Sequence, residues 1–119
     1  MTLLGWLDRK VNGPLCRLGA LCPAYARIGI HHGQCGYHLV PQQTGDGAMF
    51  IAENVVWACN AANFGEKNNR TLYRMKHITV FGHDRIERIE AAAQAGAKYS
   101  TAELLMMREQ IKTKLATLT

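Results

Sequence analysis

The clearest periodic pattern of apolar and polar positions lies in the C-terminal third of the chain. Between residues 84 and 118, apolar side chains recur at the spacing of one helix face. The first stripe is Ile86, Ile89 and Ala93, and the second is Leu104, Met107, Ile111, Leu115 and Leu118. Each stripe is preceded by a pair with the spacing of a capping box, Asp84 with Glu87 and Ser100 with Glu103. Gly96 lies between the stripes and supplies a left-handed stop, so we predict two antiparallel helices over residues 84–118.

The first two thirds of the chain show shorter patterns. An apolar stripe over residues 3–11 predicts N-terminal helical turns, and a second helical stripe follows over residues 14–23. Alternating or β-branched positions predict strands over residues 25–31, 36–41 and 71–81.

The pattern of residues 48–63 allows two interpretations, and the choice between them changes the number of strands in the predicted fold. Their pattern favours a helix, with two short strands in the same segment as the alternative.

The length and composition of the chain fit a single domain. The 119 residues are 48% hydrophobic and 19% charged, which gives room for one core. We therefore predict an α+β fold with N-terminal helical turns, a small mainly antiparallel sheet and a C-terminal antiparallel helical hairpin, in a single domain of residues 1–119.

The net charge of +5 is unevenly distributed along the chain. Residues 28–66 contain no Lys or Arg, whereas residues 67–76 hold four basic residues and no acid. This distribution indicates either a polyanionic partner or a face that keeps the protein soluble. No apolar run reaches the roughly 18 residues of a membrane span, and no secretory signal is evident. We expect a cytoplasmic protein with reduced cysteines and no membrane partner.

Residues 89–105 read IEAAAQAGAKYSTAELL. With Ala92 on the first helix, Gly96 at the turn, and Ala102 and Leu105 on the second helix, residues 86–106 resemble the DNA-binding helix-turn-helix of the lac-repressor type. The resemblance implies that the start of the second helix meets base edges, through Tyr99, Ser100 and Thr101. It also implies phosphate contacts from Lys98, Arg108 and Lys112. The alternative is an ordinary helical hairpin.

A second basic segment precedes this hairpin. Arg70, Arg74 and Lys76 lie in the predicted strand over residues 71–81 or at its start, with Tyr73 among them. A basic strand with an aromatic side chain loosely resembles a platform for single-stranded nucleic acid.

The last predicted helix carries more apolar residues than one buried face needs. Leu104, Leu105, Met106 and Met107 are four consecutive apolar residues. The surplus indicates either that the helix covers the rest of the domain or that it forms an interface with a protein partner or a second copy. The interface residues would be Leu104, Met106, Met107, Ile111 and Leu115.

Cysteines and histidines cluster near the N-terminus. Within residues 16–38 lie Cys16, Cys22, His31, His32, Cys35 and His38. Cys35 and His38 have the two-residue gap with which two ligands share a tetrahedral zinc ion. Cys22 and His31 would complete a structural site, with Cys16 and His32 as alternatives for these positions. The competing interpretation is buried thiols beside surface histidines.

The sequence favours binding over catalysis. Gly45-Asp46-Gly47 lacks the glycine and lysine that a phosphate-binding loop needs. We expect a small basic non-enzymatic binding protein, a DNA-associated regulator or accessory factor, with no small-molecule substrate and no cofactor other than a structural zinc ion. The alternative is a protein-binding module, either a small subunit of a larger assembly or a phage-type inhibitor of a host protein complex.

Overall fold

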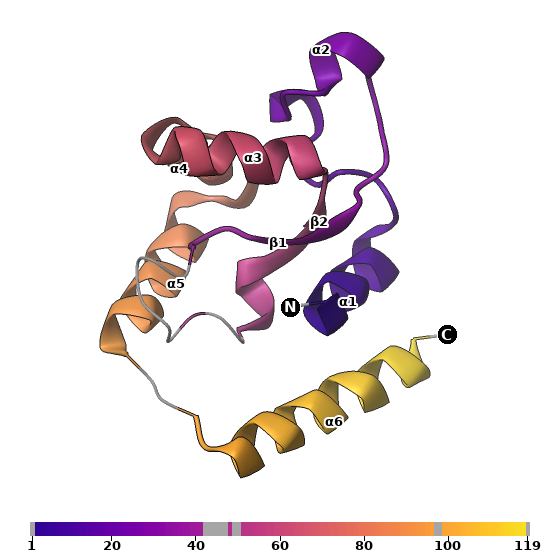
Figure 1. Cartoon of the computed structure of the whole chain (residues 1–119), viewed down its shortest axis with the longest axis vertical. Helices are drawn as coiled ribbons and strands as arrows, with labels where there is room; N and C mark the ends of the chain where they lie inside the picture. The colour runs from indigo at the N-terminus through magenta and orange to yellow at the C-terminus, as the bar shows by residue number, and fades with distance from the viewer. Residues whose placement is uncertain (1, 42–47, 49–50, 97–98, 119) are drawn as a thin grey trace.

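The computed structural model describes residues 2–41, 48, 51–96 and 99–118. Its elements in chain order are α1 (Thr2–Asn12), the 3-10 turn η1 (Gly19–Leu21), α2 (Tyr25–Ile28), β1 (Cys35–His38), the 3-10 turn η4 (Ala52–Asn54), β2 (Val55–Ala58), α3 (Asn60–Asn68), α4 (Arg70–Phe81), α5 (His83–Ala95) and α6 (Thr101–Thr117) (Figure 1). The predicted α+β class, the N-terminal helix and the small antiparallel sheet are confirmed. No helix in the described part of the chain has both the length and the apolar character of a membrane span.

The two strands form an antiparallel pair that is covered on both faces. Its register runs from Cys35 opposite Ala58 to His38 opposite Val55. Along β2, Val55 and Trp57 point toward α1, and Val56 and Ala58 point into the larger core, so all four residues are buried. Figure 1 shows this pair between α1 on one side and α3, α4 and α5 on the other.

The larger core lies between the sheet, the loop after α1 and helices α3 to α5. Tyr37, Val56, Ile86 and Ile89 are at most 1% exposed within it. A smaller cluster lies on the α1 side, where Leu4, Leu7 and Val55 are covered by Ile111 and Leu115 of α6.

The predicted strand over residues 71–81 is wrong, because this segment is helix α4. Its β-branched and aromatic residues favoured a strand, but the side chains that reach the core follow a helical spacing, with Tyr73 and His77 buried. Asn69 caps the helix by accepting a hydrogen bond from the Leu72 amide at 3.2 Å.

Two further assignments also change. Residues 25–28 form the short helix α2 instead of a strand. In the ambiguous segment the helix preference is wrong for residues 55–58, which form β2, and holds only from Asn60 onward.

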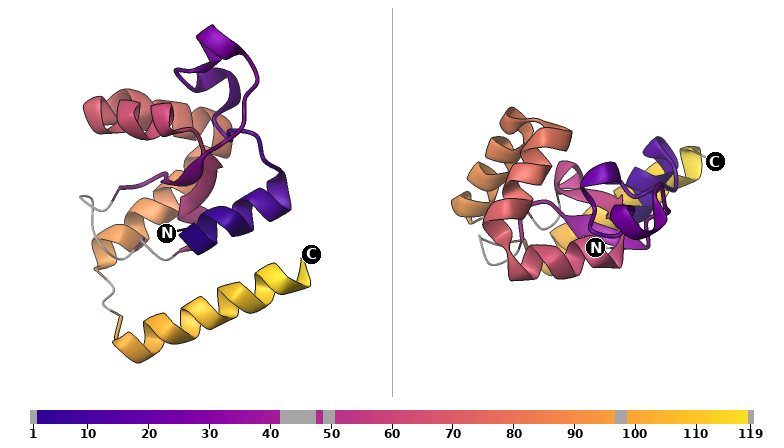
Figure 2. Two further views of the ribbon diagram at one scale, coloured as in Figure 1. Left: turned by 45° about the vertical axis from the view of Figure 1, so that its right-hand side comes forward. Right: turned by 90° about the horizontal axis from the view of Figure 1, so that it is seen from above.

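The predicted C-terminal helices are present, but they do not pack as an antiparallel pair. Gly96 ends α5 with a φ of 67°, and Ser100 and Glu103 form the predicted capping box of α6. Asp84 is not a cap, since α5 begins at His83. Helix α5 packs against α4, whereas α6 lies along α1 (Figure 2). The apolar face of α5 is buried in the larger core and is not available to α6. The apolar stripe of α6 therefore covers the smaller cluster on α1.

Asn54 connects three chain segments from inside the core. Its Oδ1 accepts a hydrogen bond from the Val40 amide at 2.7 Å, and its Nδ2 donates to the carbonyls of Val40 at 3.0 Å and Ala48 at 3.1 Å. The side chain is fully buried, so no water replaces these bonds.

Replacing Asn54 by alanine is therefore expected to lower the free energy of unfolding by about 2–4 kcal/mol, because buried backbone groups lose their partners. Urea denaturation monitored by tryptophan fluorescence measures the change. Asn68→Ala is the control, because its amide bonds the Phe64 carbonyl on the exposed side of α3. Equal effects of the two substitutions would contradict the assigned role of Asn54.

Candidate metal centre

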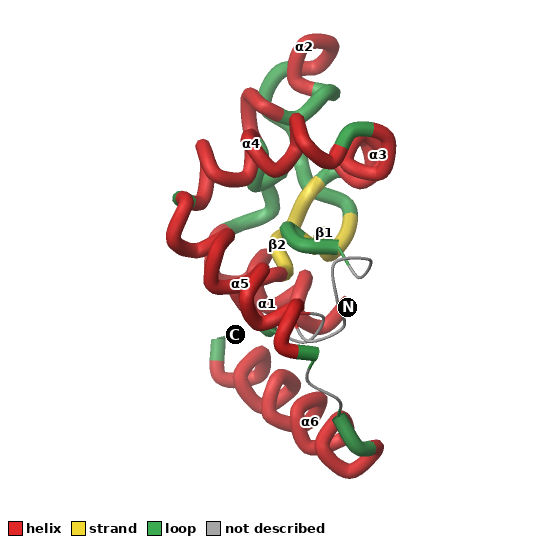
Figure 3. Tube along the Cα trace, turned by 90° about the vertical axis from the view of Figure 1, so that its left-hand side faces the viewer, coloured by secondary structure: helices red, strands yellow, loops and turns green. Residues whose placement is uncertain are grey.

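A backbone bridge brings two distant parts of the N-terminal region together. Leu15 pairs with His32 in an isolated antiparallel bridge. The Cys16 amide donates to the His31 carbonyl at 2.9 Å, and the Gly33 amide donates to the Pro14 carbonyl at 2.8 Å. The chain between these points forms only η1, α2 and irregular turns, drawn largely in green in Figure 3. Cys16 and His31 are thus placed side by side by backbone hydrogen bonds.

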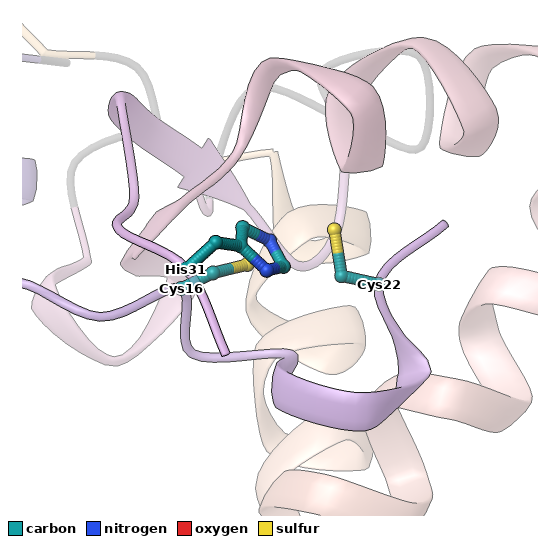
Figure 4. Close-up of side chains that lie close together, drawn as sticks. All are labelled: Cys16, Cys22 and His31. Atoms are coloured by element: carbon teal, nitrogen blue, oxygen red, sulfur yellow. The ribbon is translucent and has the colours of Figure 1, made fainter. Parts of the chain in front are cut away.

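Cys22 reaches the same point from the other side of this loop. Its amide closes the turn η1 by donating to the Gly19 carbonyl at 3.1 Å, and Gly19 has the positive φ of 53° that the turn requires. The Sγ atoms of Cys16 and Cys22 and a ring nitrogen of His31 lie within 4.8 Å of one another (Figure 4). Cys16 is 5% exposed and Cys22 is 3% exposed, so both cysteines are enclosed, whereas His31 is half-buried.

The orientation of His31 suits a metal ligand. Its Nδ1 lies 2.8 Å from the Gly29 carbonyl, which only accepts hydrogen bonds, so the proton belongs on Nδ1 and the lone pair on Nε2. Nε2 is buried and has no hydrogen-bond partner among the described residues. Metal-binding histidines have this arrangement, in which one ring nitrogen donates to a carbonyl and the other binds the ion.

The Cys22 thiol is protonated when no ion is bound. Burial, together with the neighbouring Cys16, raises the pKa of Cys22 to about 12. A bound zinc ion would hold both sulfurs as thiolates and release their protons to water. In a tetrahedral site the ligand atoms are roughly 3.5–3.8 Å apart, so the three atoms need to approach by about 1 Å to hold zinc.

The predicted ligand set is corrected in two of its four positions. Cys22 and His31 belong to the cluster, but Cys35 and His38 do not. These two residues lie on strand β1, and residues three apart in a strand point to opposite faces, so they cannot share one ion. Cys16, an alternative for the third ligand in the sequence, takes part instead.

Comparison with protein-family models, with curated proteins and with solved structures gives no match to this chain. Its function therefore has to be inferred from its own residues.

The structure does not bring together the residues that the helix-turn-helix resemblance requires. Ala102 and Leu105 are exposed on α6, and α6 packs against α1, so they do not face Ala92 of α5. Ser100 and Thr101 are exposed at the start of α6, and Tyr99 is half-buried.

The predicted phosphate contacts on this helix are only partly available. Lys98 lies outside the described residues. Arg108 is exposed, and Lys112 pairs with Glu109 at 3.6 Å. DNA binding through α6 stays a prediction.

The other predicted basic residues lie on helix α4 and contact groups of their own chain. Arg74 makes two hydrogen bonds of 2.8 Å to the carboxylate of Glu90. Arg70 lies 4.0 Å from Glu66, and Lys76 lies over the Tyr73 ring at 4.4 Å. Because these three cations already contact groups of their own chain, a nucleic acid would have to displace those groups to bind the cations.

The predicted interface residues of α6 divide into two groups. Leu104, Met107, Ile111 and Leu115 are half-buried; Met107 and Ile111 line a cavity of about 210 Å³ beside Leu4 and Leu7 of α1. Met106, by contrast, is 58% exposed, and its neighbour Leu105 is 54% exposed.

A separate buried polar pair lies in the larger core. The Tyr37 hydroxyl and His77 Nε2 are 2.5 Å apart, and His77 is 1% exposed. Burial lowers the pKa of His77 to about 4, although a hydrogen bond with the Leu39 backbone acts in the opposite direction. His77 lines a cavity of about 80 Å³ together with four other ionisable residues, Glu66, Arg70, Arg74 and Glu90. The charge of Lys76 also lowers the pKa of His77.

This pKa makes the stability of the protein sensitive to acid. The neutral form of His77 is favoured in the folded state, so its contribution is complete above pH 6.5, the ordinary pKa of histidine, and is lost as the pH falls toward 4. The loss is on the order of 3 kcal/mol. Urea denaturation at several pH values measures it, and in His77→Gln the decline between pH 6.5 and 4 should be smaller. An unchanged decline would show that other groups cause it.

Proposed function

We propose that this protein binds one zinc ion through Cys16, Cys22 and His31, and that the ion holds its N-terminal region in place. The observation that carries the proposal is the convergence, within 4.8 Å, of two buried thiols and a half-buried imidazole. The unpartnered His31 nitrogen adds to this, because a buried polar atom without a partner costs free energy that an ion would remove.

The donor atoms determine the metal. Two thiolates and an imidazole are typical ligands of zinc, whereas magnesium and calcium take oxygen ligands. The enclosed position of both cysteines favours a structural site over a catalytic one, since a catalytic ion needs a coordination position that substrate can reach.

Leu18 and Ala24 anchor the loop on either side of Cys22 in the larger core, but its regular elements add little support. Between Asn12 and Cys35 the regular elements are the three-residue turn η1 and the four-residue helix α2, and neither contains a buried residue. Ile28 and Ile30 are 64% and 75% exposed, so they contribute little apolar burial. A zinc ion would link three points of this loop, and its binding free energy would become folding free energy.

Metal analysis of protein purified without added metal tests the proposal. We expect about one zinc ion per chain. His31→Ala should weaken zinc binding by roughly 100-fold or more, whereas His32→Ala, at the exposed neighbouring position, should leave it unchanged. A chelator should also lower the thermal unfolding temperature of the wild-type protein by roughly 5 °C or more. A metal-free protein that takes up no zinc and resists the chelator would refute the proposal.

A second function is favoured by the exposed apolar residues of α6. This helix has no fully buried residue; Leu105 and Met106 are 54% and 58% exposed, and Leu118, which caps its end, is 46% exposed. Such a helix is suited to bind a protein partner or a second copy of the chain.

If two copies associate through α6, the double variant Leu105→Glu, Met106→Glu should be monomeric where the wild-type protein is dimeric, because two charges cannot be buried without partners. Sedimentation equilibrium measures the association. Thr113→Glu, also exposed on α6, is the control for added charge on the same helix. A wild-type protein that stays monomeric at high concentration would exclude the homodimer.

A further inference from the structure

A small cavity lies between helices α3, α4 and α5 and the segment that follows β1. Its volume is about 80 Å³, and its apolar wall is formed by Leu39, Val40, Pro41 and Ile86. A water molecule takes up about 30 Å³, so the cavity has room for two waters or for a molecule of about five or six non-hydrogen atoms. None of the residues that line it belongs to the proposed zinc site, so a ligand here is independent of the metal.

The charged wall of the cavity holds two pairs that differ in how closely they are bonded. Arg74 donates two hydrogen bonds of 2.8 Å to Glu90, so these two charges satisfy each other. Glu66 and Arg70 are 4.0 Å apart, which is too far for a hydrogen bond. His77 also lines the cavity but adds no charge at neutral pH, because burial lowers its pKa to about 4. Glu66 and Arg70 are therefore the pair that keeps hydrogen-bonding capacity for a ligand.

Glu66 and Arg70 lie at different depths. The side chain of Glu66 is 8% exposed and that of Arg70 is 51% exposed, so the carboxylate lies inside the cavity and the guanidinium at its mouth. Burial raises the pKa of Glu66, although Arg70 and Lys67 act in the opposite direction. A buried carboxylate costs free energy unless donors or a cation satisfy it, and Arg70 at 4.0 Å does so only in part. A ligand that brings a positively charged donor to Glu66 would meet this need.

We propose that this cavity binds a small amino acid in its zwitterionic form, with the ammonium group on Glu66 and the carboxylate on Arg70. A ligand donor and a ligand acceptor that are about 3 Å apart can each reach one of two protein groups 4.0 Å apart. The ammonium and carboxylate groups of an amino acid have this separation, and both hydrogen bonds would be charge-assisted. The size of the cavity limits the ligand to glycine or alanine, and the methyl group of alanine would contact the apolar wall.

Three probes of similar size test the assignment at neutral pH. Alanine has both charged groups, ethylammonium lacks the carboxylate, and propionate lacks the ammonium group. Isothermal titration calorimetry should show that alanine binds roughly 10-fold or more tightly than either analogue, because each analogue loses one charge-assisted hydrogen bond. Changes in amide NMR shifts should place alanine beside Val40 and Glu66, which line the cavity from opposite walls.

Two substitutions test the two contacts separately. Glu66→Gln keeps the size of the side chain and should weaken alanine binding by roughly 10-fold or more, because the ammonium group loses its anionic partner. Arg70→Gln should weaken alanine binding by a similar factor without weakening ethylammonium binding. Glu87→Gln is the matched control, since Glu87 is an exposed carboxylate on α5 that does not line the cavity. Circular dichroism checks that the variants fold, and Arg70 is exposed, so its variant tests the proposal even where Glu66→Gln is unstable.

The possible results decide between this ligand and simpler occupants of the cavity. If none of the three probes changes the NMR shifts, the cavity holds only water and the proposal is refuted. If ethylammonium binds as tightly as alanine, the cavity is a cation site in which Arg70 has no part, and the assignment is overturned. Alanine binding that Glu66→Gln leaves unchanged would place the amino acid elsewhere on the protein and would also contradict it. Each of these results leaves the proposed zinc site unaffected.

Discussion

The outer edge of strand β2 at Trp57 is the constraint on which the rest of this structure depends. A two-stranded sheet leaves unpaired backbone groups on both edges, and buried groups of this kind need partners. The Trp57 amide donates to Asp8 of α1 at 2.8 Å, and its carbonyl accepts from the Arg17 amide at 2.9 Å. The Arg17 guanidinium closes the arrangement by bonding Asp8 at 2.9 Å. One peptide edge thus fixes the position of α1, and of the loop that carries Cys16.

Whether an element is buried on one face or on both explains why part of the fold could be predicted from the sequence and part could not. Helices α1 and α5 each bury one stripe and α6 half-buries one, so their periodicity is visible in the sequence. The stop at Gly96 and the capping box at Ser100 are local signals. Residues 55–58 are buried on both faces, so their apolar run does not alternate and resembles a buried helix. In residues 71–81 the tertiary contacts of Tyr73 and His77 outweigh the strand propensity of their neighbours.

The candidate metal site shows a different limit of sequence reasoning. Spacing finds ligands that are close in the chain, and it selected Cys35 with His38, which strand geometry separates. The cluster in the structure is formed by the bridge between Leu15 and His32, a contact between positions far apart in the sequence. The apolar stripe over residues 14–23 predicts a regular helix, in which Cys16 and Cys22, six residues apart, would be a poor pair of zinc ligands. The turn at η1 replaces that helix and brings their sulfurs together.

The edge of β2 and the candidate metal site hold different parts of the same loop. The hydrogen bonds of Arg17, and the one from the Gly33 amide to the Pro14 carbonyl, hold the two ends of the loop against the rest of the protein. Cys22 is the ligand that lies between them, on the stretch with η1 and α2. An ion bound there would restrain the part of the loop that backbone pairing does not reach. The exposure of Ile28 and Ile30 fits this division, since the stretch after Ala24 has little apolar burial of its own.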